Sequence, residues 1–166
     1  MGQAIGALFG LLTAFLLTFV ILMFGSIIPA DVVNRTIVED FLGYPDLELK
    51  LAVVGTVLYP PQLGLMLQYG AQRPTVLMAL AWGTGGLIAG LLARDFVQGI
   101  FAAIFAVIIG ALLTWLIVFI VGTEDLAAIF GTLSLLAMQY ALEGALYPGI
   151  AAVIGGILGG GISRKR

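Results

Sequence analysis

The sequence predicts an all-α integral membrane protein with four transmembrane helices, built as two tandem repeats of the same orientation. Three observations predict this fold: 61% of the 166 residues are hydrophobic, only 10% are charged, and several long apolar runs contain no charge at all. Soluble domains are about 45–50% apolar and about 25% charged, so the composition excludes that class. In each repeat we also expect a short apolar segment on the outer side of the membrane.

The composition also excludes several functional classes. The chain has no cysteine and no histidine, which removes the usual zinc and haem ligands and any catalytic pair built on those residues. Three of the seven basic residues are the last three of the chain, so they do not form a stripe that follows a nucleic-acid backbone. We therefore expect no enzymatic activity, no cofactor, no metal and no nucleic-acid partner.

Four apolar regions are long enough to cross a membrane, which takes about 20 apolar residues. The first is residues 4–28, which contain no charged side chain. The second and third are residues 75–93 and 96–121, separated by a single two-residue turn. The fourth region, residues 126–162, is 37 residues long and is interrupted by Glu143. It is too long for one simple span and too short for two full spans with a loop.

Two shorter apolar segments accompany these spans. Residues 49–70 are broken in the middle by Pro60 and Pro61, which end a helix and turn the chain. This segment either lies flat at the interface or enters the membrane and returns; re-entrant backbone is tolerated only where protein or water satisfies it. The second segment, residues 126–142, contains no such breaker and favours a helix lying at the surface or tilted. Residues 144–162 are then the fourth span.

Two pairs of segments match in the same order in the two halves of the chain, which indicates an internal duplication. The first pair is residues 16–21 and 112–117, offset by 96 positions, and the second pair is residues 85–94 and 155–164, offset by 70. Because both halves have the same orientation, we expect the axis that relates them to lie along the membrane normal.

The chain is accordingly interpreted as a single membrane domain over residues 1–166. Its first repeat covers residues 4–94, including an acidic outer loop at 30–50, and its second repeat covers residues 96–166. The acidic loop also carries a glycosylation sequon at Asn34.

Glycines spaced four apart form the most prominent pattern in the spans. Pairs of small residues on one helix face allow two backbones to approach closely in a membrane. We interpret these faces as helix-packing surfaces, used either within the chain or against a partner subunit. The glycines are Gly6, Gly10, Gly86, Gly90, Gly155, Gly156, Gly159 and Gly160. Gly99 lies outside this pattern and is expected to tolerate substitution.

Few other side chains suggest chemistry. Glu143 is the only acid inside an apolar run, and an intramembrane carboxylate is a functional-site hypothesis by default. The repeat aligns it with the residue beside Arg73, so the two form a possible polar site at the outer interface. Trp82 lies near the middle of its span, whereas Trp115 and the tyrosines, Tyr59 among them, fall mostly toward the outer half. An aromatic belt is the interpretation for most of these residues.

Orientation follows from the basic cluster at the C-terminus, residues 164–166. The positive-inside rule places this cluster in the cytoplasm, and four spans then place the N-terminus there as well. We expect a multi-pass integral membrane protein with both termini cytoplasmic.

The function predicted from these observations is that of a non-enzymatic structural or accessory subunit of a larger membrane protein complex. Its partners would be the lipid bilayer and either other membrane subunits or further copies of the chain. The alternative is a small oligomeric channel or transporter whose outer segments re-enter the membrane and line a path.

Overall fold

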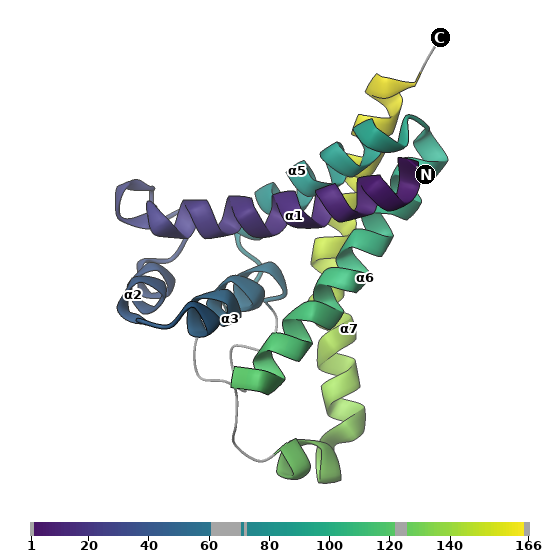
Figure 1. Ribbon diagram of the computed structural model, residues 1–166. Helices are drawn as coiled ribbons and strands as arrows, with labels where there is room; N and C mark the ends of the chain where they lie inside the picture. The colour runs from purple at the N-terminus through teal and green to yellow at the C-terminus, as the bar shows by residue number, and fades with distance from the viewer. Residues whose placement is uncertain (1, 61–70, 72, 122–125, 165–166) are drawn as a thin grey trace.

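In the computed structural model, most of the described part of the chain is helical and none of it is a strand (Figure 1). It describes residues 2–60, 71, 73–121 and 126–164, with the backbone alone in 118–121 and 126–142. Four of its helices contain a stretch long and apolar enough to cross a membrane. The stretches are Gly2–Met23, Val76–Ala93, Phe96–Ile117 and Glu143–Ser163. The all-α class and the four candidate spans are thus confirmed.

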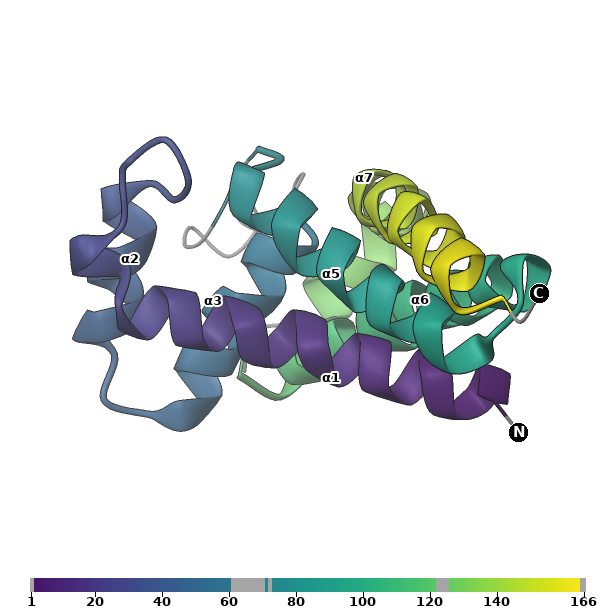
Figure 2. The ribbon, with the colours of Figure 1, turned by 90° about the horizontal axis from the view of Figure 1, so that it is seen from above.

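The long helices are α1 (Gly2–Met23), α5 (Val76–Ala93), α6 (Phe96–Val121) and α7 (Leu126–Ser163). Helix α5 lies between α1 and α7, as Figure 2 shows from above. Both chain ends lie at the same end of the bundle, beside the turn between α5 and α6 (Figure 1). We call this the terminal end of the bundle.

Side chains define where the helices begin. The side-chain oxygen of Thr75 accepts a hydrogen bond from the backbone N–H of Met78, which caps the start of α5. Asp95 caps α6 in the same way, accepting from the backbone N–H groups of Val97 and Gln98 at 2.9 and 3.1 Å. Between them, Arg94 adopts a left-handed conformation with φ 58° and ends α5. A turn of only two residues therefore makes α5 and α6 antiparallel neighbours.

The acidic stretch at 30–50 is not the loop expected from the sequence, because most of it is helical. Helix α2 (Arg35–Gly43) begins at Asn34, whose side chain accepts from the backbone N–H of Thr36 at 3.0 Å. The helix buries one face, and its Phe41 meets the ring of Phe19 edge-on at 5.3 Å. The segment is thus a helix because its apolar residues, at helical spacing, are buried on one face while its charges lie on the opposite face.

Helix α3 (Leu47–Leu58) packs between α1 and α6, on the side where these two helices diverge (Figure 1). From residue 52 to residue 60 every residue is buried, so this part of α3 is surrounded on all sides. Tyr59, the residue after its last helical residue Leu58, places its hydroxyl oxygen close to Gly110 in the middle of α6. One arm of the segment 49–70 is therefore inserted among the long helices, whereas residues 61–70 lie outside the described part.

Helix α7 differs from its sequence-based description. Residues 126–142 and 144–162 were expected to be a separate segment and a span, but they form one helix of 38 residues that contains Pro148. At a rise of 1.5 Å per residue this helix is about 57 Å long, nearly twice the thickness of the hydrocarbon layer. No helix-breaking pair such as Pro60-Pro61 occurs within it, and Pro148 alone removes one hydrogen bond without ending the helix.

Candidate functional site

The buried end of α3 brings together polar side chains from three helices. The hydroxyl of Tyr59 donates a hydrogen bond to the carbonyl oxygen of Val107 in α6 at 2.5 Å. The indole N–H of Trp82 in α5 donates to the carbonyl oxygen of Leu58 at 3.1 Å. The last carbonyls of a helix have no partner within it, so the indole satisfies one of them. We call Tyr59, Trp82 and Thr114 the α3-end cluster.

Thr114 of α6 is the unusual member of this cluster. It is 1% exposed, and its hydroxyl has no hydrogen-bond partner among the described residues. It faces Gly55 of α3, where a Cβ would lie 2.6 Å from the Thr114 Cγ2 atom. Thr18 and Thr56 are equally buried, but each donates to a carbonyl oxygen of its own helix at 2.9 Å. Among the described residues, α3 and α6 thus approach each other closely at a buried threonine hydroxyl that has no hydrogen-bond partner.

Sequence reasoning missed the role of Tyr59. Its assignment to an aromatic belt is wrong, because the side chain is only 3% exposed and its ring meets Trp82 edge-on at 5.5 Å between centroids. The signal that was available is the pair Pro60-Pro61, which marks a helix end directly after Tyr59. An arm of about ten apolar residues that ends there is about half as long as a membrane-crossing helix, and Tyr59 lies against the middle of α6.

The predicted glycines of α1 lie against α5. A Cβ at Gly6 would lie 2.6 Å from the carbonyl oxygen of Ala89, and a Cβ at Gly10 would lie 2.6 Å from that of Gly85. Real Cβ atoms essentially never approach other atoms this closely. The two backbones are therefore in direct contact, with α1 and α5 running in opposite directions.

The second contact of α5 is with α7. Gly86 and Gly90 of α5 face α7, and Gly155 and Gly159 of α7 face α5. A Cβ at any of these four positions would overlap a backbone carbonyl oxygen of the other helix. Successive residues along α5 thus contact different neighbours, because a step of one residue turns the side-chain direction by about 100°.

The remaining predicted glycines, Gly156 and Gly160, lie against α6. A Cβ at either would lie 2.7 Å from a carbonyl oxygen, that of Gly99 or that of Asp95. The expectation for Gly99 is wrong, because a Cβ there would lie 2.7 Å from the carbonyl oxygen of Gly156. Gly99 has no partner glycine four residues away, so a search for paired glycines in one helix overlooked it.

The predicted polar pair lies away from these contacts. Arg73 is exposed just before the start of α5, and Glu143 is half-buried at the first residue of the last candidate span. The polar site formed by these two residues stays a prediction. A search of the described residues for three or more metal-ligating side chains in one place finds none.

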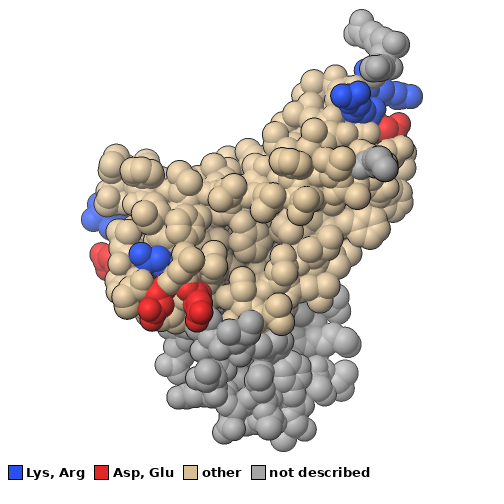
Figure 3. Space-filling view, in the orientation of Figure 1, with Lys and Arg blue, Asp and Glu red and all other residues tan. Residues whose placement is uncertain are grey.

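On the face that Figure 3 shows, the charged side chains gather at two ends of the molecule. Arg94, Asp95 and Arg164 lie at the terminal end, where the Ser163 hydroxyl donates to the carbonyl oxygen of Gly90 at 3.3 Å. At the opposite end lie the charges of α2 and of the start of α3, including Lys50 over the ring of Phe41. On the face shown, the surface between these two ends carries no charged side chain.

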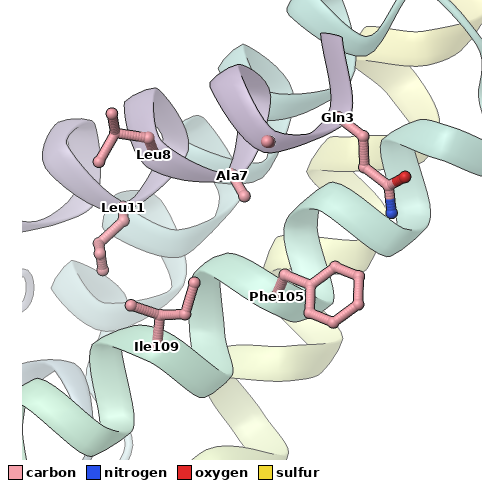
Figure 4. A pocket seen from close by; sticks show the side chains of 7 residues that line it. Gln3, Ala7, Leu8, Leu11, Phe105 and Ile109 are labelled. Atoms are coloured by element: carbon pink, nitrogen blue, oxygen red, sulfur yellow. The ribbon is translucent and has the colours of Figure 1, made fainter. Parts of the chain in front are cut away.

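A groove runs between α1 and α6 and has a volume of about 320 Å³ (Figure 4). Ala7 and Leu11 are its most buried lining residues, and Leu8, Phe105 and Ile109 are exposed along it. Among the described residues that line it, Gln3 alone has a polar side chain. We call this the α1–α6 groove.

Comparison of the chain with known protein families, with curated proteins and with solved structures finds no match. What can be said of the protein's general class therefore depends on its four apolar helices. The chain has the features of a multi-pass membrane protein.

Proposed function

We propose that the chain is a non-enzymatic structural or accessory subunit of a larger membrane protein assembly. The observation that supports this proposal is that several buried polar side chains donate hydrogen bonds to backbone carbonyl oxygens of the helices. Tyr59 and Trp82 both donate to helix carbonyl oxygens, and Thr18 and Thr56 donate to carbonyls of their own helices. The bonds of Tyr59 and Trp82 join the end of α3 to α6 and α5, and such fixed contacts between helices suit a scaffold.

The glycine contacts support the same role. In lipid there is no hydrophobic drive between helices, so close backbone packing is a principal source of association. The contacts of α5 with α1 and α7 hold three helices together through glycines. Large apolar side chains lie on the other faces of the long helices and point away from the bundle. Leu16, Leu112 and Ile162, for example, are 62%, 66% and 73% exposed. These outward faces are the surfaces we assign to lipid and to neighbouring subunits.

We further propose that the two halves arose by duplication. Helices α1 and α6 run in the same direction, with Gly6 beside Ala102, which lies 96 positions later. Helices α5 and α7 also run in the same direction, with Gly90 beside Gly160, 70 positions later. These are the two offsets of the sequence repeat, and an axis along the membrane normal brings equivalent positions of parallel helices together. The terminal end, with Arg94 and Arg164, is assigned to the cytoplasm.

Purification from native membranes in a mild detergent tests the subunit proposal. We expect the chain to migrate with other membrane proteins, which mass spectrometry of the purified complex identifies, and to produce no ion flux when it is reconstituted alone in liposomes. A chain that always purifies without other proteins, at every detergent concentration, contradicts the proposal.

A second function, that of a small channel or transporter, is favoured by α3 and Thr114. A helix that ends in the middle of a membrane bundle is typical of transporter binding sites, and the Thr114 hydroxyl is buried without a partner. Selective, saturable flux from the pure protein supports this function and contradicts the first. Thr114→Val, which replaces the hydroxyl by a methyl group of similar size, then lowers the flux, whereas Thr13→Val on the exposed side of α1 leaves it unchanged.

A further inference from the structure

The α1–α6 groove opens on the apolar surface of two helices that are each long and apolar enough to cross a membrane. It follows α1 from Gln3 to Leu11, a distance of about 12 Å at 1.5 Å per residue. Leu8 and Phe105 are 55% and 47% exposed beside it, whereas Ala7 is 5% exposed. The groove is therefore a shallow apolar channel with a small residue on its floor and large residues on its rims (Figure 4).

The dimensions of the groove limit what fits into it. A volume of about 320 Å³ spread over about 12 Å gives a mean cross-section of about 27 Å². An α-helix with its side chains is about 10–12 Å wide, so it would cover the groove without filling it. An extended hydrocarbon chain, which is one methylene group wide, matches the groove in both width and polarity.

The Gln3 end of the groove lies beside positive charge. The start of α1 packs on the end of α5, since a Cβ at Gly2 would lie 3.0 Å from the carbonyl oxygen of Leu92, two residues before Arg94. Arg94 is exposed, and Arg164 is exposed at the same end. The acid in the same turn, Asp95, keeps its charge while it caps α6, but the exposed Arg94 and Arg164 outnumber it. A lipid headgroup at this end therefore meets an excess of positive charge and one amide.

We propose that the α1–α6 groove binds one acyl chain of an anionic phospholipid whose headgroup lies at Gln3 and Arg94. The apolar lining accepts the chain, and the charge at one end selects the headgroup. Basic residues near a membrane surface attract anionic lipids by electrostatics. The bound lipid fills the groove and connects the terminal ends of α1 and α6.

Native mass spectrometry of the delipidated protein tests this proposal. The protein in detergent is titrated with phosphatidylglycerol and, separately, with phosphatidylcholine that carries the same acyl chains. We expect one phosphatidylglycerol per chain to bind about fivefold or more tightly than phosphatidylcholine, since each basic residue near the headgroup contributes about that factor. Arg94→Gln is expected to lower phosphatidylglycerol affinity about fivefold and to leave phosphatidylcholine binding unchanged.

Two matched variants locate the site. Ala4 is an exposed alanine of α1 that lines the groove, and Ala79 is an exposed alanine of α5 that does not. Ala4→Phe fills the groove and is expected to abolish the tightly bound lipid, whereas Ala79→Phe is expected to retain it. The helical circular dichroism signal of both variants shows that they are folded.

Three results overturn the proposal. The first is equal binding of the two lipids, and the second is retention of the tight lipid in folded Ala4→Phe. The third is found with a photocrosslinking residue at Leu8 in native membranes, which is expected to capture lipid. Capture of a second polypeptide there shows that a partner helix, and not an acyl chain, occupies the groove.

Discussion

The hydroxyl of Tyr59 donates to the carbonyl oxygen of Val107 at 2.5 Å, which joins the end of α3 to the middle of α6. The two residues are 48 positions apart in the chain. Trp82 contacts the Tyr59 ring from α5 and donates to the residue before it. Three separate segments are therefore held at one buried point, and substitutions there test how α3 is anchored.

Trp82→Phe is expected to destabilise the protein more than Tyr59→Phe does. Loss of the indole N–H leaves the Leu58 carbonyl buried without that partner at a helix end, which costs about 1–3 kcal/mol. Loss of the Tyr59 hydroxyl removes one donor from Val107, whose carbonyl lies inside a helix, and this costs about 0.6 kcal/mol in a membrane protein. Thermal unfolding in detergent measures both, with exposed Tyr147→Phe as the control. The reverse order contradicts the anchoring role of Trp82.

Three glycines of α5 provide a matched series. Gly86→Ala and Gly90→Ala are each expected to destabilise the protein by about 1–3 kcal/mol, because the new Cβ overlaps the backbone of α7. Gly83→Ala places its Cβ where no atom lies within 4 Å and is expected to stabilise the helix by about 0.5–1 kcal/mol. Denaturant titration in mixed micelles measures the three free energies. If all three variants gain stability, α5 and α7 do not pack as described.

Gly99→Ala belongs with the destabilising group, contrary to the expectation from sequence. Its Cβ would lie 2.7 Å from the carbonyl oxygen of Gly156, so we expect a loss of about 1–3 kcal/mol. The same denaturant titration measures it, with Gly161→Ala as a control at an open position. A neutral Gly99→Ala would show that α6 and α7 are further apart at this point.

A double-mutant cycle tests the contact between α3 and α6. Gly55→Ala is expected to destabilise the protein, because its Cβ would lie 2.6 Å from the Thr114 Cγ2 atom. Thr114→Ser removes that methyl group and is expected to recover at least half of the loss. Residues in contact show coupling energies of about 0.5–3 kcal/mol. Additive effects of the two substitutions would mean that α3 does not touch α6 at Thr114.

The chain has no cysteine, so single cysteines report topology without a background. Asp46→Cys, before α3, and Arg164→Cys, after α7, are both at exposed positions at opposite ends of the molecule. A thiol reagent that does not cross membranes is expected to label Asp46→Cys in intact cells and Arg164→Cys only after the cells are opened. Labelling of Arg164→Cys in intact cells reverses the proposed orientation.

The sequence by itself determined the helical class, the four candidate spans and the positions of the charges. These features depend on local quantities, because hydropathy over about 20 residues decides whether a helix is long and apolar enough to cross a bilayer. The caps at Thr75 and Asp95, which the structure shows, are local in the same sense, since each side chain acts on backbone N–H groups within the next three residues. No other part of the protein needs to be known for these predictions.

Only the tertiary structure decided where the short segments lie. Whether residues 49–58 rest on the surface or enter the bundle depends on whether neighbouring helices leave room and supply hydrogen bonds. Trp82 and Val107 supply them from distant parts of the chain. The same reason explains Gly99, whose close partner Gly156 lies on another helix. Contacts between helices depend on their relative register and rotation, which no local pattern of residues specifies.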